Sequence, residues 1–215
     1  KKPMAAAFRI LSLLLTVMLT AAMVTYPQAV DDTRAGVVTR IQSSAIAIQD
    51  AAPRVLAVGS SIFINDIVST GADARVDIRM IDDTVITLSA RTQFVVMQYQ
   101  FDGDQGDALL RLITGTFRAV TGKIAKLEGR PFKVVTNVAT IGVRGTEFWV
   151  GAFKNVPHVE LIGGGGVTVE NAGGRVEVTR PGWGTFIKDA NTKPTKPEFW
   201  PKTMNDMVKE SMAFK

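Results

Sequence analysis

The chain of 215 residues contains no cysteine and a single histidine, His158. The lack of cysteine excludes disulfide bonds, thiolate metal ligands and a cysteine nucleophile. With one histidine and no thiol, a metal site would have to be built from oxygen ligands. A domain of this length can bury a core without disulfides, so their absence does not identify a cellular compartment.

Catalytic motifs are also missing. No Gly-x-Ser-x-Gly elbow presents a serine to His158, which we interpret as an exposed or hydrogen-bonded strand residue. The glycine run 163–166 is not followed by Lys-Ser/Thr and a helix, so it is not a phosphate-binding loop. We therefore predict that the protein is not an enzyme and that it needs no cofactor.

The acidic stretch FDGDQGD, residues 101–107, is the one candidate for an oxygen-ligand metal site. Its spacing does not fit an EF-hand, because Gly106 takes the third ligand position and no glutamate lies at the twelfth. We interpret the stretch as a solvated loop and predict no metal site.

An apolar stretch near the N-terminus, Ile10–Val24, follows three basic residues and precedes Pro27 and Ala29. A basic head, a short apolar run and a small-residue exit are typical of a secretory signal. We predict a signal peptide over residues 1–29 and a periplasmic, exported protein. The alternative is an uncleaved anchor, because Pro27 makes the cleavage site imperfect. Membrane attachment is expected only through this segment, if it is uncleaved.

The formal net charge gives little support for nucleic-acid binding. Removal of Lys1, Lys2 and Arg9 with the leader, which contains no acid, lowers this charge from +5 to +2. Such a balanced surface is not typical of a protein that binds DNA or RNA. We expect a protein or a cell-envelope component as the partner, and no nucleic acid.

Residues 30–190 follow a period of two. Val76, Ile78 and Met80 alternate with charged residues, which is typical of a half-buried strand. The stretch 167–179 predicts a hairpin, because glycine in its centre supplies the positive φ of the turn. Short strands separated by frequent turns predict an all-β sandwich or roll of short antiparallel strands and hairpins. Residues 41–52 fit a helix or a strand, and we favour a strand.

The composition changes at residues 191–215. Three prolines among lysines predict an extended linker. Apolar residues then recur every three to four positions, which predicts a short C-terminal amphipathic helix. These residues are Trp200, Met204, Met207, Val208 and Met212. The helix either packs on the β domain or docks on a partner or membrane surface.

Three ordered blocks resemble the FecR domain family of bacterial exported regulatory proteins. The first block covers residues 55–88, where a series of small and polar turn residues matches the family pattern. The matching residues are Gly59, Asp66, Thr70, Gly71, Asp82 and Thr84. Asn65 and Asp83 replace family glycines, and both residue types tolerate the left-handed backbone conformation.

The second block, LLRLITGTFRAV, covers residues 109–120, and the third covers residues 132–150. The third is similar to the family pattern that ends in Arg-Gly-Thr-x-Phe. Its matching residues are Thr136, Ala139, Arg144, Gly145, Thr146 and Phe148, while Asn137 stands where proline is usual. The resemblance covers about residues 37–187.

The resemblance implies an all-β module outside the cytoplasmic membrane. The best-known members also restrain a sigma factor through a cytoplasmic segment. Nine residues precede the apolar stretch of this chain, and we expect no such segment. The chain resembles small exported proteins in which the FecR domain stands almost alone.

Arg144 has two interpretations. It is a structural pin, with its guanidinium satisfied by carbonyl groups or by an acid such as Asp66 or Asp82, or it recognises a carboxylate or phosphate of a ligand. We favour the pin. In either case Gly145 is expected to bend the chain and Thr146 to hydrogen-bond the local backbone.

Two functions follow from the sequence. The first is a non-enzymatic sensing or interaction module in envelope signalling. The alternative is a ligand- or polysaccharide-binding β domain of the envelope, in which Arg144, Trp149 and Trp183 line a site.

Overall fold

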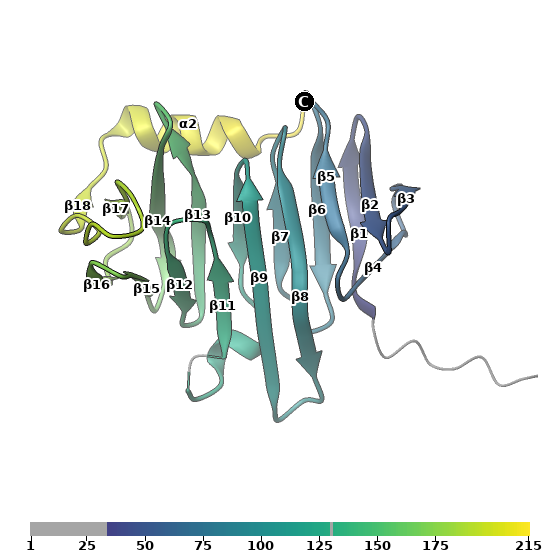
Figure 1. Cartoon of the computed structure of the whole chain (residues 1–215), viewed down its shortest axis with the longest axis horizontal. Helices are drawn as coiled ribbons and strands as arrows, with labels where there is room; N and C mark the ends of the chain where they lie inside the picture. The colour runs from purple at the N-terminus through teal and green to yellow at the C-terminus, as the bar shows by residue number, and fades with distance from the viewer. Residues whose placement is uncertain (1–33, 130) are drawn as a thin grey trace, which may run out of the picture. The chain divides into compact units, whose positions relative to one another are not determined.

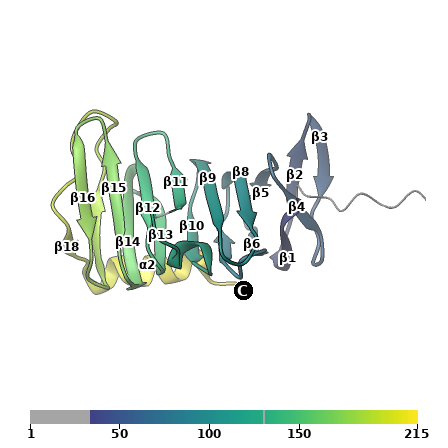
Figure 2. The ribbon, with the colours of Figure 1, turned by 90° about the horizontal axis from the view of Figure 1, so that it is seen from below.

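The computed structural model describes residues 34–129 and 131–215, so the predicted signal peptide lies outside the described residues. The described part is one unit. Two nine-stranded sheets face each other across an apolar core, and the predicted all-β sandwich is confirmed (Figures 1 and 2).

Both sheets run from late strands of the chain at one edge to early strands at the other. In this spatial order, sheet A contains β18 (Glu198–Phe199), β17 (Trp183–Phe186), β14 (Val156–Gly164), β13 (Thr146–Phe153), β10 (Phe117–Val120), β7 (Val85–Leu88), β6 (Arg75–Met80), β1 (Arg34–Gln42) and β4 (Ser61–Phe63). Sheet B contains β16 (Gly174–Val178), β15 (Val167–Asn171), β12 (Thr140–Val143), β11 (Phe132–Val135), β9 (Gly106–Thr114), β8 (Gln93–Phe101), β5 (Ile67–Thr70), β2 (Ala45–Gln49) and β3 (Ala52–Val55). A 3-10 turn, η1 (Ile124–Lys126), and a helix, α2 (Lys202–Met212), complete the fold.

Alternating side chains build the core between the sheets. In β6 the apolar Val76, Ile78 and Met80 are buried, whereas Arg79 is exposed on the opposite face. Successive side chains of a strand point to opposite faces, so this alternation gives each sheet one apolar face. Aromatic rings join the layers: Phe117 of sheet A lies 5.5 Å from Phe94 of sheet B, measured between ring centroids.

The chain places successive segments alternately in the two sheets. From β6 onward it builds β6–β7 in sheet A, β8–β9 in sheet B, β10 in sheet A, β11–β12 in sheet B, and so on to β18. Neighbours in space are therefore close in sequence, and the colour in Figure 1 runs steadily from one end of the sheets to the other. Strands β9 and β11 pair in parallel because β10 crosses to the other sheet between them.

Several local predictions are confirmed. Residues 41–52 contain the end of β1 and all of β2, so this stretch is strand and not helix. The predicted hairpin is β15–β16, with Gly174 at a φ of +136°. The acidic stretch is the β8–β9 turn, in which Asp102 Oδ1 accepts hydrogen bonds from the N–H groups of Asp104 and Gln105.

The C-terminal segment is more firmly attached than the linker prediction implied. Thr185 Oγ1 donates to Thr195 O at 2.7 Å, and Pro194 is buried. Trp200 precedes the helix and is 1% exposed, whereas Met207, predicted on the apolar face, is 39% exposed. Of the two alternatives for the helix, the structure shows packing on the β domain, where α2 covers the outer face of sheet A (Figure 2).

Candidate functional site

Arg144 and Gly145 form the crossover from β12 in sheet B to β13 in sheet A. Gly145 has a φ of +53°, a left-handed conformation that glycine adopts readily. The glycine therefore supplies the expected bend. The Arg144 N–H donates to Gly166 O at 3.2 Å, and the Arg144 side chain is exposed.

The Arg144 side chain lines a pocket of about 130 Å³ between the β12–β13 crossover and the β14–β15 loop. Its other lining residues are Gly142, Gly165, Gly166, Val167, Thr168, Glu177 and Thr179. No described residue forms a hydrogen bond or ion pair with the Arg144 guanidinium. The pocket thus combines an exposed cation with two threonine side chains, glycine backbone and the acidic Glu177. Arg144 can bind an anionic group there, and Glu177 restricts which anionic ligands fit.

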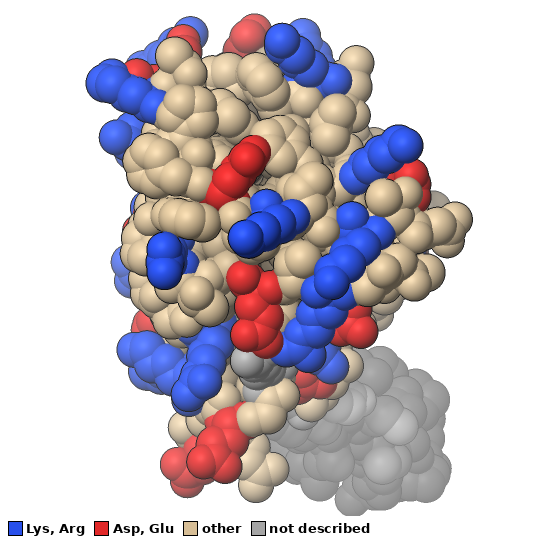
Figure 3. All heavy atoms as spheres, turned by 90° about the vertical axis from the view of Figure 1, so that its left-hand side faces the viewer, with Lys and Arg blue, Asp and Glu red and all other residues tan. Residues whose placement is uncertain are grey.

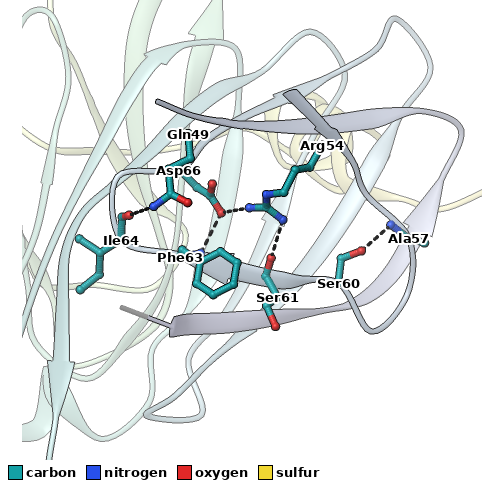
Figure 4. A network of polar contacts seen from close by, with 8 residues as sticks. All are labelled: Gln49, Arg54, Ala57, Ser60, Ser61, Phe63, Ile64 and Asp66. Atoms are coloured by element: carbon teal, nitrogen blue, oxygen red, sulfur yellow. Dashed lines mark hydrogen bonds and ion pairs between the residues drawn. The ribbon is translucent and has the colours of Figure 1, made fainter. Parts of the chain in front are cut away.

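The interpretation of Arg144 as a pin on Asp66 or Asp82 is wrong, because both acids are bonded elsewhere. Asp66 is fully buried, and its Oδ2 accepts hydrogen bonds from Arg54 Nη2 at 2.5 Å and from the Phe63 N–H at 2.8 Å (Figure 4). Arg54 also donates to Ser61 O at 3.2 Å. This network closes the β4–β5 turn onto β3.

Asp82 connects three segments through a fully buried carboxylate. Its Oδ1 accepts from the Tyr99 hydroxyl at 2.6 Å and from the Thr84 N–H at 3.0 Å. Its Oδ2 accepts from the Thr84 hydroxyl and from the Ile124 N–H, both at 3.0 Å. Burial, together with the Asp82 charge, raises the pKa of Tyr99 well above its usual value. Asp82 and Thr84 therefore have a structural role.

The remaining residues of the first family block also stabilise turns. Thr70 Oγ1 donates to Ser89 O at 2.6 Å and accepts from the Thr92 N–H at 2.8 Å. Gly71 accepts from the Arg91 N–H through its carbonyl, and Gly59 has a φ of +88°. These contacts connect loops to one another, and they bring no reactive side chains together.

Thr146 differs from its prediction. Its backbone N–H donates to Thr121 Oγ1 at 2.8 Å, and its carbonyl accepts from the Thr121 hydroxyl at 2.8 Å. The Thr146 hydroxyl itself is buried without a hydrogen-bond partner. The side chain that bonds the local backbone is therefore that of Thr121.

The structure does not bring Arg144, Trp149 and Trp183 into one site. Trp149 is 4% exposed and packs on the outer face of sheet A against Trp200, with a centroid separation of 6.1 Å. Trp183 pairs with Leu161 in register and packs against the core between the sheets. The two indoles thus belong to opposite faces of sheet A.

The cluster beneath α2, which we call the covered face, was not predicted from the sequence. It consists of outward-facing residues of sheet A and the apolar residues of the C-terminal segment. They are Trp149, His158, Glu160, Ile162, Phe186, Trp200, Met204, Val208 and Met212. His158 and Glu160 alternate with core residues, and this pattern is also that of a solvent-exposed strand face.

Two titratable groups of the covered face are buried. Glu160 is 4% exposed, and its burial raises the pKa of the carboxyl to about 7. His158 is fully buried, and burial lowers the pKa of its imidazole. Of the two predicted alternatives, the structure shows the hydrogen-bonded strand residue: Nδ1 lies 2.5 Å from Val156 O, whereas Nε2 has no partner.

Among the described residues, no group of three histidine, aspartate or glutamate side chains comes together as a metal site would require. No helix in residues 34–129 and 131–215 combines the length and apolar character needed to cross a membrane. Figure 3 shows lysine and arginine side chains interspersed with acids over the end of the sandwich that contains β16 and β18.

Comparison with known proteins identifies one family. A family model described as FecR protein matches residues 66–177. No curated protein matches the sequence.

Two solved structures share the fold. Both are of a protein of Parabacteroides distasonis ATCC 8503 described as a "putative anti-sigma factor", at 1.65 Å and 2.50 Å resolution. The identities are 22% and 21%, and the TM-score is 0.51 for each. The alignments cover 66% of this chain and 64% and 63% of those chains, so this protein spans less than two thirds of their length.

Proposed function

This chain belongs to the FecR family, and we propose that it is a non-enzymatic module of the periplasm that regulates envelope signalling by binding another protein. The family match carries the proposal. The anti-sigma description of the two solved structures supports a regulatory role that depends on protein partners. The predicted signal peptide over residues 1–29 supports the location.

The fold supports binding more than catalysis. The polar residues of the first family block are used in turns, as Asp66 with Arg54 and Asp82 with Tyr99 show. The end of the sandwich drawn in Figure 3 has charges of both signs, unlike the single-sign field of a nucleic-acid-binding face. This end is compatible with a protein partner.

The proposal is tested by cross-linking in living cells that express the tagged full chain. We expect the chain to be cross-linked to a second envelope protein and to be recovered in the periplasmic fraction with Val30 as its first residue. Deletion of the gene should change the transcription of a defined set of genes. Recovery of the chain without an adduct, together with unchanged transcription after deletion, would contradict the proposal.

A second candidate function is the binding of a small ligand through a carboxylate or phosphate. The Arg144 pocket favours it, because the guanidinium there is exposed and engaged by no described residue. We expect Arg144→Ala to abolish binding of such a ligand in calorimetry, and Arg111→Ala, at an exposed position of β9, to leave binding unchanged. Equal affinities in the two variants would remove this candidate.

A further inference from the structure

The covered face and α2 together hold most of the unsatisfied buried polar side-chain atoms of the described chain. Seven buried side-chain nitrogen or oxygen atoms in residues 34–129 and 131–215 lack a hydrogen-bond partner. Four of them belong to the covered face and the helix above it: His158 Nε2, Glu160 Oε2, Trp200 Nε1 and Asn205 Oδ1. Buried polar atoms are normally paired, so their concentration at one contact indicates that α2 is an incomplete match for this surface.

The covered face is nevertheless shaped to accommodate the indole rings that pack on it. Gly184 lies directly opposite Glu160, and a Cβ atom there would overlap the Trp200 ring. At Gly151 a Cβ atom would overlap the Trp149 ring. The two glycines thus leave space for two indoles on the outer face of sheet A.

Apolar contacts and two hydrogen bonds of Ser211 hold the helix on the sheet. Val208 and Met212 are buried, and Met204 is partly buried, so the inward positions recur every four residues. Pro201 precedes the helix, and no side chain caps the helix N-terminus. Ser211 provides two contacts: its Oγ accepts from Trp149 Nε1 at 3.3 Å and its carbonyl accepts from Ser89 Oγ at 2.8 Å.

Glu160 indicates which side chain a helix would need in order to match the covered face more completely than α2 does. Its Oε2 is buried without a donor, and Lys209 of α2 acts on it only through its charge. Lys209 is exposed, while Glu147 on the neighbouring strand adds negative charge and is itself paired with Arg118. A helix with an inward-facing lysine or arginine would supply the missing hydrogen bond and countercharge.

We propose that the covered face is the docking surface for an amphipathic helix of a partner protein, with apolar residues every fourth position and a basic residue that pairs with Glu160. α2 occupies this surface until the partner displaces it. The inference rests on the proposed function, because it names the kind of partner that the module binds. Helix-in-groove recognition uses the same spacing of apolar anchors.

The test uses the full chain with α2 released by Val208→Asp. A tethered helix competes at an effective concentration of about 1 mM, so the intact chain would mask binding of a free peptide. The probe is a labelled peptide of residues 198–215 in which Asn205 is changed to lysine. Asn205 lies one turn before Lys209 and is partly buried, so a lysine there is directed towards the sheet. The control peptide carries Thr203→Lys at an exposed position and has the same charge.

We expect the Asn205→Lys peptide to bind the Val208→Asp chain about tenfold more tightly than the control peptide. The difference should fall below about twofold when Glu160→Gln is added to the chain. Equal affinities of the two peptides, or no saturable binding below about 1 mM, would overturn the proposal. If Val208→Asp does not fold, Met212→Asp replaces it. Loss of the cooperative melt in both would show that α2 is integral to the fold, and it would also overturn the proposal.

Cross-linking in cells separates this inference from the proposed function. In the intact chain, Asn205→Lys should retain α2 and reduce the partner adduct, whereas Val208→Asp should increase it. An adduct that both variants leave unchanged would refute the covered face as the docking surface while leaving the proposed function intact. The absence of an adduct in every variant would refute both.

Discussion

Asp82 shows how a residue of the family pattern stabilises the fold. Its carboxylate accepts four hydrogen bonds, from Tyr99, from Ile124 and twice from Thr84. We expect Asp82→Ala to lower the free energy of unfolding by about 3 kcal/mol or more, because it leaves several buried donors unpaired. Urea unfolding of the variant and the parent chain measures this change.

Asp83 is the matched control for Asp82. It is exposed, and its ion pair with Lys123 spans 2.7 Å between two solvent-accessible side chains. Solvent screens an ion pair of this kind, so it contributes little to stability. Asp83 has a φ of +69°, so the control is Asp83→Asn, which keeps a residue type that tolerates the left-handed conformation. A similar loss of stability in Asp82→Ala and Asp83→Asn would contradict the structural role of Asp82.

Replacement of Arg54 and replacement of Arg144 are also expected to differ in their effect on the free energy of unfolding. The Arg144 side chain is exposed and its guanidinium has no described partner, so Arg144→Ala should change the free energy of unfolding by less than about 0.5 kcal/mol. Arg54→Ala should lower it by about 2 kcal/mol, because the buried Asp66 carboxylate loses its cation. Thermal melts of both variants measure this. A larger loss for Arg144→Ala would restore the structural-pin interpretation.

Glu160 makes stability depend on pH in a defined direction. Its pKa rises from 4.5 to about 7 on folding, through burial and the nearby Glu147, against the opposing charge of Lys209. Between pH 4.5 and 7 the folded state therefore keeps a proton that the unfolded state releases. The free energy of unfolding should fall by up to about 3 kcal/mol as pH rises through this window, and level off above it.

Comparison with Glu160→Gln isolates this effect. Burial lowers the pKa of His158, so His158 acts in the opposite sense below pH 6.5, but it is present in both proteins. The difference between the two stability curves should therefore vary between pH 4.5 and 7 and be constant above pH 7. Parallel curves over the whole range would show that Glu160 is not protonated when buried.

At the scale of elements, α2 is expected to be separable from the sandwich. Its apolar contacts with the domain form a cluster distinct from the main core. Deletion of residues 201–215 should lower the free energy of unfolding by about 2–4 kcal/mol, through loss of the buried Val208 and Met212 side chains. The β-sheet signal in circular dichroism should still melt cooperatively. A gradual melt would contradict a separable helix.

The elements that sequence predicts well are those formed by local chemistry. The β15–β16 hairpin follows from alternation around a glycine turn, and the turns at Asp66 and Asp82 follow from the family pattern. The crossover at Arg144 was harder to predict, because a bend within one sheet and a passage between two sheets have the same sequence signature. The covered face was not predictable, because His158 and Glu160 are buried beneath a C-terminal segment whose Trp200 follows some forty residues later.

At the scale of the whole domain, the C-terminal segment connects distant strands of sheet A. Trp200 packs over β17, Ser211 bonds Ser89 beyond β7, and Phe214 lies 3.8 Å from the Arg40 guanidinium on β1, measured to the ring centroid. Figure 1 shows this segment crossing the sheet from the β17 side to the β6 side. Release of α2 would therefore expose the outer face of several strands of sheet A at once. A partner protein would then have access to this surface.

Helix docking on the covered face is tested most directly by photo-crosslinking in cells from a reactive residue at position 162, within this face. Position 97, partly exposed on the outer face of sheet B, serves as the reference. We expect a partner adduct from position 162 that increases with Val208→Asp, and none from position 97. An adduct from position 97 alone, with only intramolecular products from position 162 in both backgrounds, would contradict it.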